Sequence, residues 1–395
     1  MDMLFYSIAY LTLFFSFLLL WSFFSSTRMQ KSSKLRPLSI IVPAYNAAKT
    51  IRSCIISLLA QDYPGLKIIV VDDGSTDSTG SIVRKLCRKH KNIAYLRKQN
   101  GGKGSALNEG LKRVNTELFG FIDADTHLSR NALRNMIGYI EGNTAAVTAA
   151  IKSDNPRNFI ERIQNIEYMM SAFARKVLTF FDSLYITPGF SIYKTSVIKR
   201  LGGFDELNIT EDLEIGLRLK SKGFNIQTSL DDSAYTKVPE NFRKLFNQRL
   251  RWNRGYIHNT RKYSGLLLNR RYGDFGVLIF PINNLVLALT TPFLLVNIYD
   301  MLISVSQRII DLFLVKFDIN YLLSTSTFSI ITPTTFFLVA TLLAFLFLIR
   351  VSRQQTSERI NKIDYLIFLI AYPFISLFLW VSAFVFEIVK AKRKW

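Results

Sequence analysis

The chain has 395 residues, enough for one sizeable globular domain together with several membrane helices. Its formal net charge of +21 would suit a nucleic-acid-binding protein, but the basic residues lie mostly beside apolar runs, without an aromatic RNA-binding signature. We therefore expect no nucleic-acid partner and interpret the charge as a cytoplasmic face against anionic lipid. Cys54 and Cys87 form no disulfide framework or zinc pattern, and three scattered histidines argue against a histidine-based metal site or triad.

Long apolar runs lie at both ends of the chain, and about 20 apolar residues suffice to cross a bilayer. The run Leu4–Phe24 predicts an N-terminal anchor within residues 1–27. A cleaved signal peptide is the alternative, but a basic leading segment and a small-residue cleavage site are missing. Residues 275–390 predict a C-terminal membrane region of about three spans: Phe275–Tyr299, Phe328–Ile349 and Tyr365–Val389. Basic residues after the first run place the middle of the chain in the cytosol.

Residues 38 to about 151 alternate short β-branched runs with segments of helical period, within a predicted cytosolic domain of residues 37–240. The strand-like runs are LSIIVPAY, LKIIVVDD, NIAYLRK, LFGFIDAD and AAVTAAI. This alternation predicts an α/β, Rossmann-like domain with a mostly parallel sheet, in which ligands bind beyond the carboxyl ends of the strands. No GxGxxG follows the first strand, so a dinucleotide site has no support.

Four further elements are predicted before the C-terminal membrane region. An amphipathic helix runs from Pro156 to Phe181, and the strand-like GFSIYKTS follows it. A second helix begins at the Thr210-Glu211-Asp212 stretch and stops near Gly223. Residues 241–262 combine an apolar face with basic flanks, which predicts an amphipathic helix lying on the membrane surface.

Acidic side chains follow two of the predicted strands. Asp72 and Asp73 could accept hydrogen bonds from a uracil imide or a ribose hydroxyl, although Asp, Gly and Ser are also common turn residues. Asp123 and Asp125 are one residue apart at the end of a buried strand. Such a pair suits a hard divalent cation that bridges two phosphates and stabilises a departing diphosphate. An isolated D-x-D is frequent by chance, and the strand context gives this one its weight.

Two helical motifs could supply the remaining chemistry. Asp212 could take a proton from an acceptor hydroxyl, whereas the alternative is simply a favourable acidic first turn. In QRLRW, which spans 248–252, Arg251 could hold a diphosphate and Trp252 could stack on a sugar face. The alternative for this motif is an interfacial anchor. Tyr45 could stack on a nucleobase, and Lys103 in a glycine-rich turn could bind a phosphate, or both could be structural.

The motifs together resemble one known family. IVPAYN, VVDDGSTD, NGGKGSALN, FIDAD, GGFDE, TED and QRLRW occur in the order and approximate spacing of family 2 inverting glycosyltransferases with the GT-A fold. The resemblance covers roughly residues 37–260. It is greatest to the membrane-integrated branch that includes hyaluronan, cellulose and poly-N-acetylglucosamine synthases, with ceramide glucosyltransferases as more distant relatives.

The resemblance implies a metal-dependent hexosyltransferase that uses a UDP-sugar donor and Mg²⁺ or Mn²⁺, with inversion and no covalent intermediate. Asp212 would be the catalytic base, and Asp123 and Asp125 would hold the metal. The implied nucleotide-sugar contacts are Pro43, Tyr45, Asp72, Asp73, Lys103, Asp123, Gln248 and Arg251. The implied acceptor contacts are Gly189, Phe190, Glu211 and Trp252. The turn at Gly189 departs from the synthases' usual small polar or cysteine-containing turn, which leaves the acceptor open.

Two activities fit this resemblance. The leading hypothesis is a multi-pass protein of the cell membrane whose cytosolic catalytic domain extends a β-linked polysaccharide processively. The alternative is transfer of a single sugar to a polyprenyl phosphate or another lipid. Either would engage membrane lipids, and a second copy of the chain in a homo-oligomer could help to complete a channel. An inactive scaffold is disfavoured because every expected acidic residue is present.

Overall fold

The structure is a computed structural model that describes residues 13, 34–314, 333–356 and 360–391. The chain divides into two compact units, one of residues 25–280 with 351–395, and one of residues 1–24 with 281–350. The first unit contains the sheet and the candidate site. The expected anchor Leu4–Phe24 lies outside the described residues, apart from Leu13.

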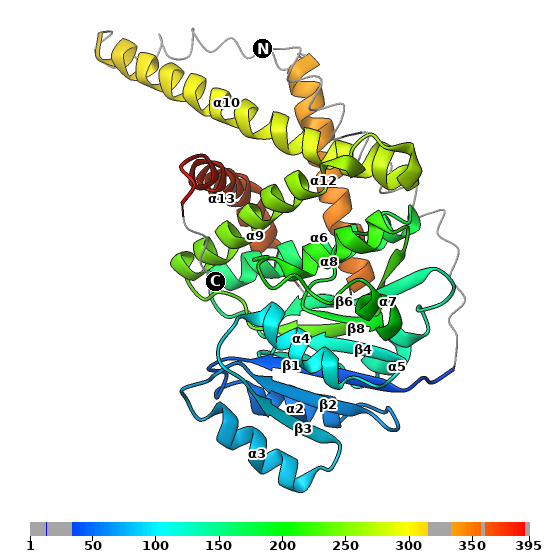
Figure 1. Cartoon of the computed structure of the whole chain (residues 1–395). Helices are drawn as coiled ribbons and strands as arrows, with labels where there is room; N and C mark the ends of the chain where they lie inside the picture. The colour runs from blue at the N-terminus through cyan, green and yellow to red at the C-terminus, as the bar shows by residue number, and fades with distance from the viewer. Residues whose placement is uncertain (1–12, 14–33, 315–332, 357–359, 392–395) are drawn as a thin grey trace. The chain divides into compact units, whose positions relative to one another are not determined.

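Eight strands form one mixed sheet in the order β3-β2-β1-β4-β7-β6-β8-β5 (Figure 1). The strands are β1 (Leu38–Ala44), β2 (Lys67–Asp72), β3 (Ile93–Arg97), β4 (Leu118–Ile122), β5 (Thr126–Leu128), β6 (Thr144–Ser153), β7 (Phe190–Lys194) and β8 (Asn225–Thr236). The pairings β1–β2, β2–β3, β1–β4 and β6–β8 are parallel, whereas β4–β7, β6–β7 and β5–β8 are antiparallel. The α/β class is confirmed, and β7 is the strand that makes the sheet mixed between β4 and β6.

Helices cover both faces of the sheet because the strands are apolar on both. Along β1, Ile40 and Val42 pack in one core with α2 (Ile51–Leu59) and α5 (Ala132–Ile137). Ile41 points to the other face and packs with α4 (Lys103–Arg113). The remaining helices of this unit's sheet region are α3 (Thr79–Lys89), α6 (Phe159–Phe180), α7 (Thr195–Arg200) and α8 (Glu211–Ser221). The period-two alternation of a strand thus builds two cores at once.

Strand β8 is the longest strand and was not expected from the sequence. Its polar run through Asp231 and Asp232 hides the alternation, yet Ile226 and Ala234 are fully buried in it. The three-residue strand β5 is too short to give a pattern. The other expected strands are present, and so are the helices expected over Pro156–Phe181 and from Thr210 to Gly223; α8 begins at Glu211, as the acidic start predicted.

Helix α9 (Phe242–Lys262) fills the segment predicted to be an amphipathic helix and packs against α13 (Lys362–Ile388) in the same unit. Short turns follow α9: η1 (Ser264–Leu266), η2 (Arg270–Tyr272) and the π-helical η3 (Phe275–Ile279). The chain then continues as α10 (Phe280–Leu314) and α12 (Pro333–Thr356), and α12 overlaps the second of the three C-terminal apolar runs.

Two helices in the described part of the chain are long and apolar enough to cross a membrane, judged by length and composition: Phe275–Leu314, of 40 residues, and Lys362–Ile388, of 27 residues. They contain two of the C-terminal runs that the sequence singled out. Helix α13 belongs to the unit that carries the sheet, so a candidate membrane helix packs directly on the domain that holds the candidate site.

Candidate active site

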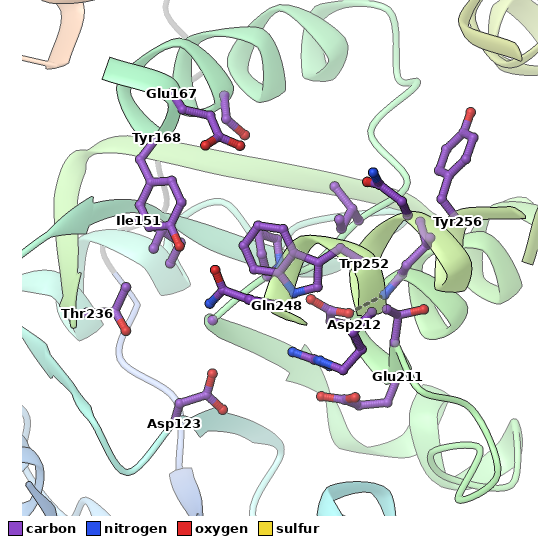
Figure 2. A pocket seen from close by; sticks show the side chains of 18 of the residues that line it. Asp123, Ile151, Glu167, Tyr168, Glu211, Asp212, Thr236, Gln248, Trp252 and Tyr256 are labelled. Atoms are coloured by element: carbon purple, nitrogen blue, oxygen red, sulfur yellow. Dashed lines mark hydrogen bonds between the residues drawn. The ribbon is translucent and has the colours of Figure 1, made fainter. Parts of the chain in front are cut away.

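A cavity of about 470 Å³ lies beyond the carboxyl end of β4, among the start of α8 and the helices α6, α9 and α13 (Figure 2). It brings together nine of the residues singled out from the sequence: Lys103, Asp123, Asp125, Gly189, Glu211, Asp212, Gln248, Arg251 and Trp252. These residues come from segments that are far apart in the chain, so tertiary packing alone assembles them.

Lys103 ties two acidic motifs together. Its Nζ lies 2.6 Å from Asp123 Oδ1 and 2.8 Å from Glu211 Oε1. Burial disfavours the charged amine, but the neighbouring carboxylates, Asp123 first, outweigh burial and raise the pKa of Lys103. The side chain at the start of α4 is therefore a fixed cation between the D-x-D pair and the start of α8.

Asp125, the second acid of the D-x-D pair, lies beside the cavity with weak hydrogen-bond partners. Its Oδ1 accepts from the hydroxyls of Thr126 at 3.2 Å and Thr236 at 3.4 Å. Burial and then the charge of Asp123 raise the pKa of Asp125. The pair thus carries more negative charge than Lys103 balances, and a further cation would stabilise it.

Glu211 and Asp212 are adjacent but differ in their surroundings. Glu211 is 2% exposed, and the charge of Lys103 outweighs burial and lowers the pKa of its carboxyl group, while its Oε2 has no hydrogen-bond partner. Asp212 borders the cavity, and burial and then the charge of Glu211 raise its pKa to about 6. Asp212 has no ion pair among the described residues, and its Oδ1 accepts only from its neighbour's backbone N–H, of Leu213, at 2.9 Å. A carboxyl group of this kind is suited to proton transfer near neutral pH.

Three residues of the QRLRW motif on α9 line the cavity. These are Gln248, Arg251 and Trp252, and Figure 2 shows Gln248 and Trp252 between Tyr168 on one side and Asp212 on the other. Arg251 Nη1 donates to the Ile209 carbonyl at 2.8 Å, directly before the acidic start of α8. This bond fixes the two motifs to each other.

Close packing holds α9 against the segment that precedes Asp212. A Cβ atom on Gly255 would lie 2.3 Å from Thr210 Oγ1, so glycine is required for this approach. Asn259 Nδ2 donates to Thr210 Oγ1 at 3.0 Å, and Asn208 Nδ2 donates to Asn259 Oδ1 at 2.7 Å. These buried amides satisfy one another and set the register of α9 on α8.

Asp72 and Asp73 do not line the cavity, because neighbouring chain segments use their oxygen atoms. The Tyr95 hydroxyl donates to Asp72 Oδ2 at 2.6 Å, and hydrogen bonds, opposed by burial, lower the pKa of Asp72. Asp73 accepts from Lys98 Nζ at 2.8 Å and from the backbone N–H of Gly102 at 2.8 Å. The structure therefore shows both acids fixing the loops at the ends of β2 and β3.

Three more residues singled out from the sequence lie outside the cavity wall. Tyr45 is 54% exposed at the carboxyl end of β1, so its ring is free to stack on a ligand, and Pro43 is half-buried in the same strand. Phe190 is fully buried in the core at the start of β7 and does not line the cavity, whereas its neighbour Gly189 does.

Helix α6 supplies a wall that the motifs did not reveal. Glu167, Tyr168, Ser171 and Arg175 line the cavity from it. Glu167 pairs at 2.7 Å with Arg249, whose guanidinium stacks on the Trp252 ring at 4.1 Å. The only available signal was a charged side chain on the apolar stripe of a predicted amphipathic helix. Trp380 of α13 completes the cavity and gave no signal beyond its apolar run.

The fold and these motifs define the class of protein. Residues 39–202 match the model of Glycosyl transferase family 2, and the chain carries a family 2 glycosyltransferase domain. The match confirms the family resemblance for this segment, and the GT-A-type fold agrees with the mixed sheet and with the solved structure compared below.

Two curated relatives resemble the chain in sequence, and one solved structure resembles it in fold. The chain is 30% identical over 222 residues to a poly-beta-1,6-N-acetyl-D-glucosamine synthase of Staphylococcus epidermidis, covering 55% of this chain and 54% of the relative. It is 28% identical over 226 residues to the synthase of the same description from Staphylococcus aureus strain COL, covering 56% and 55%. The match spans about half the length of these relatives. In fold, the chain resembles the mannosyltransferase PcManGT of Pyrobaculum calidifontis, solved in complex with GDP-Man and Mn²⁺, with a TM-score of 0.59 and 19% identity over 87% of this chain and 97% of that one.

Proposed function

We propose that the protein is a membrane-bound inverting glycosyltransferase that moves a sugar from a UDP-sugar onto a growing polysaccharide and forms a β-glycoside. One observation carries the proposal: Asp212, with a pKa raised to about 6 and no ion pair in the described structure, borders the same cavity as Trp252 and the D-x-D pair. A base, a charged phosphate site and an aromatic sugar platform thus meet in one place.

Asp212 would accept the proton of the acceptor hydroxyl as the oxygen attacks the anomeric carbon. The bond between that carbon and the diphosphate breaks as the new glycosidic bond forms, so the configuration inverts in one displacement. Glu211 cannot serve equally well, because its pairing with Lys103 lowers its pKa and weakens it as a base. Glu211 would instead accept a hydrogen bond from the acceptor through its unpartnered Oε2.

The donor would lie between the D-x-D pair and α9. Lys103 and Arg251 would face the diphosphate, and Gln248 would contact the sugar. Tyr45 and Pro43 would lie beside the nucleobase of the donor. Asp72 and Asp73 would contribute through the loops that they fix, or would meet the uridine directly if those bonds rearrange. The donor would in either case add contacts to a largely preformed site.

The residues present fit a divalent cation, which this class of enzyme is expected to use as Mg²⁺ or Mn²⁺. No group of three or more His, Cys, Asp or Glu side chains with suitable placement occurs in the described ranges. Asp123 and Asp125 would therefore hold the cation together with phosphate oxygens, the hard ligands that such cations prefer. When bound, the cation would stabilise negative charge on the departing diphosphate.

The relatives favour a polymerising activity, since those we compare are poly-beta-1,6-N-acetyl-D-glucosamine synthases by description. The cavity wall on α13 supports a membrane setting. The protein would be multi-pass in the cell membrane with its catalytic domain in the cytosol, because basic residues follow the first apolar run and several apolar runs follow the domain. A single transfer to a lipid acceptor is the second candidate, because Trp380 on a candidate membrane helix borders the cavity. Assembly of a homo-oligomer would enlarge the membrane wall around a product.

The test uses the full chain in lipid nanodiscs with Mg²⁺ or Mn²⁺ and a panel of radiolabelled UDP-sugars, and the products are sized with and without polyprenyl phosphate. A long product formed without added lipid would support polymerisation. One labelled lipid would establish the second candidate. No transfer with any donor, together with no UDP binding by calorimetry, would refute the proposed function.

A further inference from the structure

The proposed reaction gives no role to Arg249, a buried cation behind the wall of the cavity. Arg249 is the second residue of the QRLRW motif. Gln248 before it and Trp252 after it line the cavity, whereas Arg249 does not. Its side chain is 5% exposed, which is rare for an arginine unless other groups pair with it. Any effect of Arg249 on the reaction must therefore pass through the residues that it contacts.

The Arg249 guanidinium contacts both of these cavity residues. Arg249 Nη1 donates to Gln248 Oε1 at 2.5 Å, and the central carbon of the guanidinium lies 4.1 Å from the centroid of the Trp252 ring. A cation within about 6 Å of an indole face is attracted by the ring. Because arginine can only donate, the bond also fixes the Gln248 amide, with its oxygen toward Arg249 and its Nε2 hydrogens left for other acceptors.

Two other helices hold the guanidinium in place. Glu167 of α6 accepts from Arg249 Nη2 at 2.7 Å, and the Tyr372 hydroxyl of α13 hydrogen-bonds to Glu167. Burial disfavours the charged guanidinium, but the charge of Glu167 outweighs burial and raises the pKa of Arg249. The cation is therefore fixed by α6 and α13 as well as by its own helix, so it can orient the side chains that it contacts.

We propose that Arg249, held by Glu167, is a positioning residue that aligns the two reacting sugars. It sets the Trp252 ring, on which the acceptor sugar would stack, and the Gln248 amide, which would meet the donor sugar. The proposal rests on the proposed function, which assigns those contacts to Trp252 and Gln248. Misplacing reacting groups by about 1 Å can cost on the order of 100-fold in rate. Loss of Arg249 should therefore lower kcat while UDP binding persists.

The alternative is that Arg249 only ties α9 to α6 through its ion pair with Glu167. A reversed pair, Glu167→Arg combined with Arg249→Glu, separates the two roles. An ion pair can form again between the helices, and the Tyr372 hydroxyl can accept where it donated before. However, a carboxylate then replaces the cation beside Trp252, and the Gln248 amide must turn round because a carboxylate can only accept. Arg249→Met should lower the Tm by breaking a buried pair, and the reversed pair should restore it.

The first measurement needs no substrate and follows the Trp252 ring in the full chain in nanodiscs. Subtracting the emission spectrum of Trp252→Phe from that of the unmodified protein gives the emission of Trp252, and the same subtraction is made in the Arg249→Met and reversed-pair backgrounds. Acrylamide quenching of this emission should rise roughly twofold in both backgrounds, because the guanidinium no longer covers one face of the ring. Unchanged quenching in both backgrounds would overturn the proposal.

The second measurement is transfer from UDP-N-acetylglucosamine to a short β-1,6-linked N-acetylglucosamine oligosaccharide, probes chosen from the description of the relatives. Arg249→Met should lower kcat by roughly tenfold or more. The reversed pair should recover the Tm but not kcat, and UDP binding measured by calorimetry should stay unchanged in every variant. Recovery of both the Tm and kcat by the reversed pair would show that the ion pair alone matters and would overturn the proposal.

Arg249→Lys keeps the proposal testable if the reversed pair does not fold. Lysine retains the charge and can pair with Glu167, but it has no planar group to lie on Trp252. Full kcat with unchanged quenching in this variant would refute the positioning role. The matched control is Arg243→Met, which removes an exposed arginine from the same helix and should change neither measurement. Absence of UDP binding and transfer in the unmodified protein would count against the proposed function, whereas the quenching comparison would still decide how Trp252 is held.

Discussion

Asp212→Asn should abolish sugar transfer while making the protein more stable at pH 7.5. Asparagine has nearly the same shape and can keep the bond to the Leu213 N–H, but it cannot accept a proton as a base. Loss of a positioned general base costs roughly 100- to 10,000-fold in rate. UDP binding should persist, because Asp212 is assigned to the acceptor hydroxyl.

The stability change follows from the pKa of Asp212, which the fold raises from 3.8 to about 6. The folded state then binds the proton more tightly than the unfolded state does, so stability falls as pH rises from about 4 to about 6. A shift of about 2 units corresponds to roughly 3 kcal/mol, and because Asp212 borders an open cavity we expect about half of it, ~1–2 kcal/mol. The variant should therefore gain a few degrees in Tm at pH 7.5 and nothing near pH 4.

The assay is thermal unfolding of the full chain in detergent at several pH values, combined with transfer kinetics. The matched control is Asp205→Asn. Lys262 pairs with Asp205 at 2.7 Å, and this pairing outweighs burial and lowers the pKa of Asp205. The control variant should therefore lose stability at pH 7.5. In the unmodified protein, transfer should rise with pH up to about 6 and then level off. Transfer by Asp212→Asn within tenfold of the unmodified protein would remove Asp212 from the base role, and an unchanged Tm at pH 7.5 would refute the electrostatic reasoning.

Two further predictions concern how α9 is held. Gly255→Ala should lower the Tm and reduce transfer at least tenfold, because the new methyl group would meet Thr210 at 2.3 Å and overpacking costs about 1–3 kcal/mol. Gly265→Ala is the control, because a Cβ atom there would meet open space, and it should change neither the Tm nor transfer. Glu387→Gln should destabilise the protein by roughly 3–5 kcal/mol in thermal unfolding, because Arg254 would lose a buried partner at 2.7 Å. Partial recovery in Arg254→Glu combined with Glu387→Arg would support the pairing, and an unchanged Tm in the single variant would contradict it.

Most of the fold could be predicted from local patterns. β-Branched runs that alternate with amphipathic segments identified the first four strands, β6 and the helices between them, and the acidic start predicted the N-terminus of α8. The polar strand β8 was missed because its burial comes from neighbours on both sides in the sheet, which no local pattern records. Similarly, the antiparallel β7 became the centre of the sheet through pairing with β4 and β6.

The sequence by itself determined which chemistry the protein carries, because carboxylates, lysine and the QRLRW motif keep their character wherever the chain places them. Only the tertiary structure decided how they are used. It joined Lys103 to Asp123 and Glu211, and it directed Asp73 into a loop instead of the cavity. It also brought an arginine of α6 and a tryptophan of α13, about 200 positions apart in the chain, to the wall of one cavity. Burial and long-range packing set pKa values and cavity walls, and neither quantity is encoded by residues that are neighbours in sequence.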